Sequence, residues 1–114
     1  MTRDRESYLH DMLDSCRFLR QMIEGEVVDR YVRDRVFRSA VERELQIIGE
    51  ALLQLRQLDD EYVQQIAEHQ QIISFRHVLV HGYHKLKPDV VWNVLTTKLP
   101  LLDSQLETLL GEES

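Results

Sequence analysis

The stretch RVFRSAVERELQIIGEALLQL at residues 35–55 decides the fold class of this 114-residue chain. Its large apolar residues recur at steps of three and four, which places them on one stripe of an α-helix: Phe37, Val41, Leu45, Ile48, Leu52 and Leu55. Gly49 lies inside this helix and costs about 1 kcal/mol relative to Ala. We expect a packing benefit that offsets this cost, namely the close approach of another helix at Gly49.

The other segments also have the period of helices rather than that of strands. Gly25 is placed to end the first helix and Pro88 to open the last, in which Pro100 should bend the axis or remove one backbone hydrogen bond. Residues 26–34 fit either a short helix or a lead-in to the next one. The sequence thus predicts a single all-α domain over residues 1–114, an antiparallel bundle of four main helices plus one short helix. The main helices are expected at about 4–24, from 35 onward, at 70–81 and at 88–110, and the short one at 59–68.

Composition is that of an ordinary globular protein, with 43% hydrophobic and 30% charged residues. We expect no membrane partner, because no apolar run approaches the roughly 20 residues that a membrane span needs. Residues 1–10, MTRDRESYLH, carry charge where a signal peptide would have its apolar region. Cys16 is the single cysteine, which excludes an intramolecular disulfide. These features predict a cytoplasmic protein.

The net charge of −6 argues against a general nucleic-acid-binding surface, which would be basic. The charge is uneven, however. Residues 69–88 contain no Asp or Glu, but they contain Arg76, Lys85 and Lys87 and four of the five histidines. One electropositive segment inside an acidic chain indicates a local site.

Within this segment, Arg76, His81 and Tyr83 form an R-x4-H-x-Y pattern. Five residues of helix turn the side chains of Arg76 and His81 about 140° apart, so spacing alone does not put them on one face. Their chemistry suits a phosphodiester, because Arg matches phosphate oxygens and His exchanges a proton near neutral pH. The simpler alternative is a surface or capping role, since a histidine in the last turn of a helix is favoured by the helix dipole.

Two blocks of the sequence resemble the HEPN superfamily, and specifically HepT-like proteins of the HepT–MntA toxin–antitoxin type. One is RSAVERELQIIGEA at residues 38–51, and the other is SFRHVLVHGY at residues 74–83, which contains the R-x4-H-x-Y pattern. The order of the helices and the length of the chain agree with that family. His77 is a departure, because HepT-like sequences usually have Asn after the Arg.

The resemblance implies a HEPN-type bundle and a metal-independent endoribonuclease that acts as a toxin. It implies no cofactor, an RNA substrate, and a homodimer in which both copies of the motif face one cleft. In such a site His81 exchanges protons with the substrate and Arg76 stabilises charge on the phosphate, while His77 orients the phosphate or Arg76.

The resemblance also implies a protein partner, a MntA-like nucleotidyltransferase that serves as antitoxin. Such enzymes are similar to those that transfer an adenylyl group to tyrosine, and the motif offers Tyr83. An adenylate on Tyr83 would place phosphate beside Arg76 and His81 and block the cleft.

Two other functions remain open from the sequence. A zinc site is one, since His77 and His81 are four residues apart on one helical face and His84 follows. A non-catalytic HEPN subunit that binds nucleotide or assists the transferase is the other, and it predicts no RNA cleavage by the isolated chain.

Glu50 and five arginines outside the R-x4-H-x-Y pattern each have two possible roles. Glu50 lies in the first resembling block and is expected either to pair with Arg76 or to be an ordinary solvated helix residue. Five arginines would widen a basic cleft, but acidic residues alternate with them, so we expect mostly a solvated face of ion pairs. These arginines are Arg30, Arg33, Arg35, Arg38 and Arg43.

Overall fold

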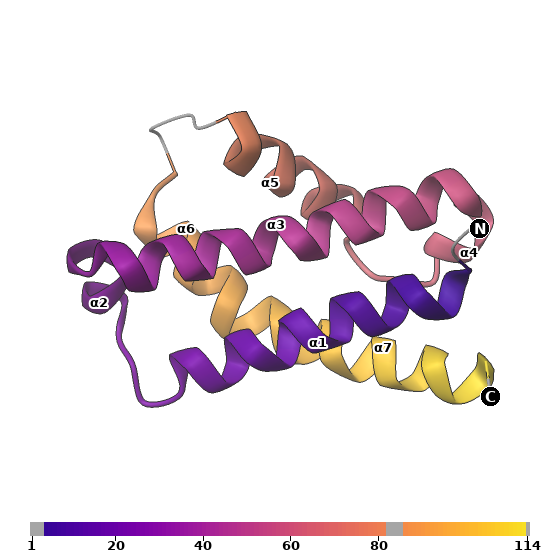
Figure 1. Ribbon diagram of the computed structural model, residues 1–114, viewed down its shortest axis with the longest axis horizontal. Helices are drawn as coiled ribbons and strands as arrows, with labels where there is room; N and C mark the ends of the chain where they lie inside the picture. Colours follow the sequence, from indigo (N-terminus) through magenta and orange to yellow (C-terminus); the bar gives the residue numbers. More distant parts are fainter. Residues whose placement is uncertain (1–3, 82–85, 114) are drawn as a thin grey trace.

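The computed structural model describes residues 4–81 and 86–113, and all regular structure in these ranges is helical (Figure 1). The long helices are α1 (Arg5–Ile23), α3 (Arg35–Leu58), α5 (His69–His81) and a C-terminal helix. The last consists of α6 (Pro88–Asn93), the π-helical segment η1 (Val94–Lys98) and α7 (Leu99–Glu113). Two short helices, α2 (Val28–Arg33) and α4 (Asp60–Val63), complete the part that is described. The all-α prediction is confirmed, and residues 28–33 are a helix.

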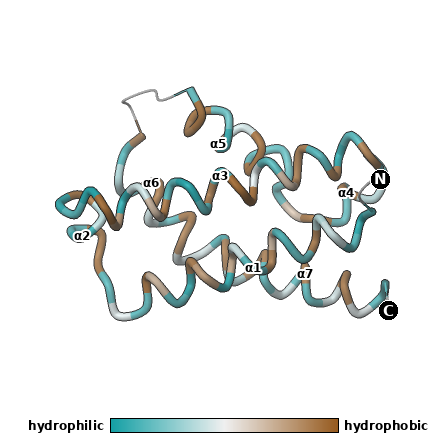
Figure 2. The backbone as a smooth tube through the Cα atoms, viewed as in Figure 1, coloured by the Kyte–Doolittle hydropathy of each residue, from teal (hydrophilic) through white to brown (hydrophobic). Residues whose placement is uncertain are grey.

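Helix α3 lies in the middle of the fold, and successive long helices run in opposite directions (Figure 1). It packs against α1 on one side and α5 on the other, while α7 packs against α1. The predicted apolar stripe of α3 is buried, with every member 5% exposed or less. Figure 2 shows hydrophobic and hydrophilic residues alternating along each long helix, as amphipathic helices require. None of the described helices is both long and apolar enough to cross a membrane.

Polar side chains set where the helices begin. Three aspartates each accept a hydrogen bond from the backbone N–H three residues later, which satisfies a donor that has no partner inside the helix. The pairs are Asp4 with Ser7 at 2.9 Å, Asp34 with Phe37 at 3.1 Å, and Asp59 with Tyr62 at 3.0 Å. Gly25 has a φ of 76°, which confirms it as the stop after α1.

The helix predicted at 59–68 is wrong in its second half, because α4 ends at Val63. Residues 64–68 form turns instead, and Glu68 adopts a left-handed φ of 60° that ends helical geometry. This path buries Ile66 completely, and it lets Glu68 pair with Lys98 at 2.9 Å. Burial of one isoleucine and an ion pair to the C-terminal helix therefore override the local helical period.

Pro100 is accommodated by the π-helical segment that precedes it. The N–H of Leu99 donates to Val94 O, a five-residue step that relaxes the hydrogen-bond ladder just before the residue that lacks an N–H. The hydroxyls of Thr96 and Thr97 donate to the carbonyls of Trp92 and Asn93, at 2.8 and 2.6 Å. The predicted loss of regular backbone bonding at Pro100 thus takes the form of a π-turn.

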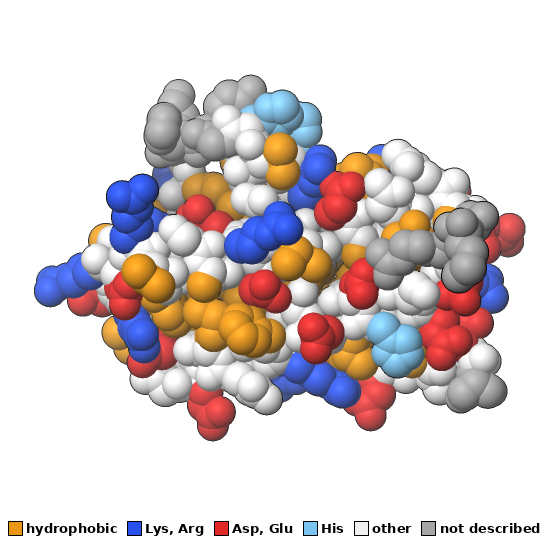
Figure 3. Space-filling model, viewed as in Figure 1, with side chains coloured by type: hydrophobic (Ala, Val, Ile, Leu, Met, Phe, Trp, Pro, Cys, Tyr) orange, Lys and Arg blue, Asp and Glu red, His pale blue; other side chains and the backbone are white. Residues whose placement is uncertain are grey.

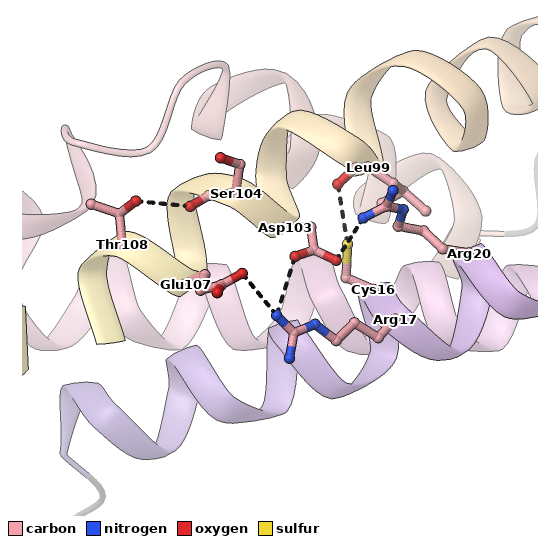
Figure 4. A network of polar contacts seen from close by, with 8 residues as sticks. All are labelled: Cys16, Arg17, Arg20, Leu99, Asp103, Ser104, Glu107 and Thr108. Atoms are coloured by element: carbon pink, nitrogen blue, oxygen red, sulfur yellow. Dashed lines mark hydrogen bonds and ion pairs between the residues drawn. The ribbon is translucent and has the colours of Figure 1, made fainter. Parts of the chain in front are cut away.

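A polar network ties α1 to α7 (Figure 4). The carboxylate of Asp103 is nearly buried and pairs with Arg20 at 2.9 Å and with Arg17 at 3.5 Å. The thiol of Cys16 donates to Leu99 O at 3.3 Å, and burial raises the pKa of this thiol to about 12. Cys16 is fully buried and is therefore a neutral member of the core.

Candidate active site

The site begins with the contact between Gly49 of α3 and Arg76 of α5. A Cβ at position 49 would overlap the Cβ of Arg76 and lie 2.6 Å from its Cγ. Only glycine leaves room for the stem of Arg76 against the α3 backbone. The close approach predicted at Gly49 is confirmed, and the residue that makes it is the arginine of the R-x4-H-x-Y pattern.

Arg76 is held there by Glu50, the residue that follows Gly49. Arg76 Nη2 lies 2.5 Å from Glu50 Oε2, and the second carboxylate oxygen of Glu50 accepts a hydrogen bond from Gln54 at 3.1 Å. The contact is a charge pair rather than an aligned hydrogen bond, because buried Glu50 Oε2 and Arg76 Nε have no hydrogen-bond partner among the described residues. The Arg76 side chain is 24% exposed, so part of it faces solvent. Of the two predicted roles of Glu50, pairing with Arg76 is the one that the structure contains.

The Arg76–Glu50 pair lines a cleft of about 320 Å³ between three helices. The α3 wall is a single face of that helix, α5 contributes Arg76 and Val80, and α1 closes the cleft with Tyr8 and Asp11. Tyr8 and Asp11 were not predicted as site residues, because the only signal they carry in the sequence is the helical period of α1. The α3 residues are Arg43, Gln46, Ile47, Glu50, Ala51 and Gln54.

His77 and His81 lie together at the end of α5, outside the lining of this cleft. Their ring centroids are 4.1 Å apart with a 59° angle between planes, and both side chains are exposed. Histidine side chains are visible in Figure 3 over the end of α5. The structure therefore brings Arg76 together with Glu50, and His77 with His81, but it does not put His81 into the Arg76 cleft of the same chain. Tyr83 lies outside the described residues.

No group of three or more potential metal ligands occurs within residues 4–81 and 86–113. His77 and His81 do share a face, as the zinc alternative requires. His84, the third histidine of that alternative, lies outside the described residues.

The five arginines of residues 30–43 differ in their partners. Arg30 pairs with Glu26 at 2.6 Å, Arg33 pairs with Asp29 at 3.0 Å, and Arg38 donates to backbone carbonyls of α2. The expectation of a face made mostly of ion pairs holds for Arg30 and Arg33. Among these five, Arg43 is the residue that lines the cleft.

Comparison with known proteins places this geometry in a family. The sequence profile of the family described as "Ribonuclease HepT-like" matches residues 12–109, which is most of the chain. The chain belongs to the HepT-like family. This confirms the resemblance drawn from residues 38–51 and 74–83, and the prediction of a HEPN-type endoribonuclease is confirmed at the level of the family.

Three relatives match over nearly their whole length. A protein of Caldanaerobacter subterraneus subsp. tengcongensis named "Putative RNase" is 29% identical over 108 residues, which cover 93% of this chain and 94% of the relative. Two proteins of Methanocaldococcus jannaschii with the same name are 21% and 22% identical over 112 and 107 residues. Those matches cover 96% and 92% of this chain, and 90% and 95% of the relatives. No solved structure gave a significant match.

Proposed function

We propose that this HepT-like protein is a metal-independent endoribonuclease that acts as the toxin of a toxin–antitoxin pair. The observation that carries the proposal is the docking of Arg76 on Gly49, beside Glu50 and partly open to a cleft. A glycine that costs helix stability serves to hold one arginine at a solvent-accessible cleft.

The reaction follows from the residue types of the motif. The imidazole of His81 removes the proton of an RNA 2′-hydroxyl, and the 2′-oxygen attacks the neighbouring phosphorus. The bond to the 5′-oxygen breaks, and that oxygen takes a proton from a second His81 or from water. The products are a 2′,3′-cyclic phosphate and a 5′-hydroxyl. Arg76 stabilises the charge that builds on the phosphate oxygens. Because the nucleophile is part of the substrate, no metal is required to generate it.

A homodimer completes the proposed site. Within a single chain, His81 lies outside the cleft that Arg76 lines. Two copies with their α5 helices facing each other would bring an acid, a base and two arginines to one phosphate. His77 and His81 remain exposed at the end of α5, which leaves them accessible to a second copy.

His77 is proposed as a positioning residue. Its ring packs against that of His81, which supports a role in holding the His81 imidazole rather than the phosphate.

The proposed antitoxin is a nucleotidyltransferase of the MntA type that adenylylates Tyr83. Tyr83 follows the end of α5 by two residues, so a modification there would add phosphate charge near His81. Coexpression with such a transferase should increase the intact mass by one adenylate, and Tyr83→Phe should remove the increment. An unchanged mass together with restored growth would instead indicate neutralisation by complex formation.

Cleavage of labelled RNA in EDTA tests the enzyme itself. Wild type should cleave, His81→Ala should not, and the control His10→Ala should match wild type. His10 is an exposed histidine of α1 that lies 3.6 Å from Glu6, remote from the motif in sequence. If unmodified wild type, verified by intact mass, leaves RNA uncut, the non-catalytic subunit becomes the better interpretation. Activity that EDTA abolishes would overturn metal independence.

A further inference from the structure

The charges on the cleft walls single out Arg43. Four charged side chains line the cleft, and two of them, Arg76 and Glu50, neutralise each other. Asp11 on the α1 wall already has an interaction partner within the fold. Arg43 is exposed and makes no ion pair or hydrogen bond with any described residue. It is the cleft cation that has no ion pair among the described residues.

Arg43 and Arg76 occupy different parts of the same cleft. Arg76 contacts α3 at Gly49, and Arg43 lies six residues earlier on α3, about 9 Å along the axis at 1.5 Å per residue. Gln46 and Ile47 lie between them on the same face of α3. On the α3 wall, the stretch from Arg76 to Arg43 is thus lined by one amide and one aliphatic side chain, without an intervening carboxylate, while Tyr8 and Asp11 of α1 line the other wall.

Because the chain has a net negative charge, a cation without an ion pair matters for the binding of a polyanion. The chain carries a net charge of −6, and Figure 3 shows basic and acidic side chains interspersed rather than a continuous basic surface. Affinity for a polyanion must then come from a few cations with unpaired charge, because phosphate contacts supply most of the electrostatic binding energy. Arg30 and Arg33 contribute little, because they are ion-paired and lie outside the cleft lining.

We propose that Arg43 binds a backbone phosphate of the RNA strand next to the one that Arg76 contacts, and that the α3 face of the cleft is the track for that strand. This inference rests on the proposed ribonuclease function and extends its site from one phosphate to two. Arg43 acts in substrate binding and takes no part in bond breaking.

The test compares Arg43→Gln with Arg35→Gln. Arg35 is also an exposed arginine of α3 without a partner among the described residues, but it lies outside the cleft. Binding of a short single-stranded RNA to His81→Ala protein is measured at several salt concentrations, so that cleavage does not interfere. Arg43→Gln should weaken binding several-fold and reduce the slope of log K against log salt by about 0.7, the value for one phosphate of a single strand. Arg35→Gln should change neither, and Arg43→Lys should keep the slope.

Kinetics with otherwise wild-type protein give a second readout. Loss of a contact made equally in the ground state and the transition state raises KM and leaves kcat unchanged, so Arg43→Gln should raise KM several-fold. If wild type cleaves RNA and Arg43→Gln has the KM and salt slope of Arg35→Gln, the inference is overturned. If wild type neither binds nor cleaves RNA, the proposed function fails first, and this inference with it.

Discussion

The two sides of α3 are packed differently. On the α1–α7 side, Leu9, Met12 and Leu106 are fully buried, and the Asp103 network adds ion pairs and a thiol hydrogen bond. On the other side, α5 buries only His69 and Leu79, while Ile72, Ile73 and Phe75 stay partly exposed. Arg43, Glu50, Arg76, His77 and His81 of the proposed site all belong to α3 and α5. The comparison indicates that α1 and α7 supply most of the stability, and that α5 keeps surface available for substrate and for a second copy.

The largest effect is expected where α5 meets α3. Gly49→Ala should destabilise the protein by about 1–3 kcal/mol despite Ala's better helix propensity, because the new Cβ overlaps Arg76. Displacement of Arg76 should also abolish RNA cleavage. Chemical denaturation and the cleavage assay measure the two effects.

Gly111→Ala is the matched control, since a Cβ there meets nothing within 4 Å. It should be neutral or stabilise by up to about 1 kcal/mol. Equal responses at the two glycines would show that α5 is not closely docked at Gly49.

The α1–α7 network should affect stability alone. Asp103→Asn removes the charge that two arginines share, and we expect a loss of about 1–2 kcal/mol, limited because both arginine side chains are about half exposed. Glu107→Gln, at the exposed end of the same network, should cost less than about 0.5 kcal/mol. Thermal unfolding measures both. A loss of cleavage in folded Asp103→Asn would contradict the division between a stabilising and a functional side.

Substitution of Glu50 should lower activity and leave stability nearly unchanged, the opposite of the result expected for Asp103. Glu50→Gln keeps the shape of the side chain but loses the charge that holds Arg76, so kcat should fall about tenfold while stability changes little. Glu44→Gln, on α3 and outside the cleft, is the control and should match wild type. A Glu50→Gln variant with wild-type kcat would remove Glu50 from the positioning of Arg76.

The smallest effect concerns Cys16. Because burial raises the pKa of this thiol from 9.0 to about 12, the folded state retains a proton that the unfolded state loses above pH 9. Stability from this group is complete below pH 9 and is lost as pH rises toward 12. The folded protein at pH 8 should react with a thiol reagent far more slowly than the denatured protein. Rapid reaction would show that α1 and α7 separate readily.

Prediction from the sequence worked best where the signal is local. The apolar period located α1, α3 and α5, Gly25 was identified as a stop, and Pro100 as a perturbation of the last helix. It failed at residues 64–68, where burial of Ile66 decides the path. It did not find Tyr8 or Asp11 and did not separate Arg43 from its neighbouring arginines, because each of these depends on a contact distant in sequence.

The sequence by itself determined the helices, the glycine at which a second helix comes close, and the R-x4-H-x-Y pattern and flanking block that mark the HepT-like family. These are encoded in residue spacing, since a period of 3.6 defines one face of a helix. Only the tertiary structure decided which residue meets that glycine and which arginine remains unpaired on a cleft wall. A period specifies which face is apolar but not which element will cover it, so the pairing of Arg76 with Glu50 and the position of Arg43 depend on how whole helices pack.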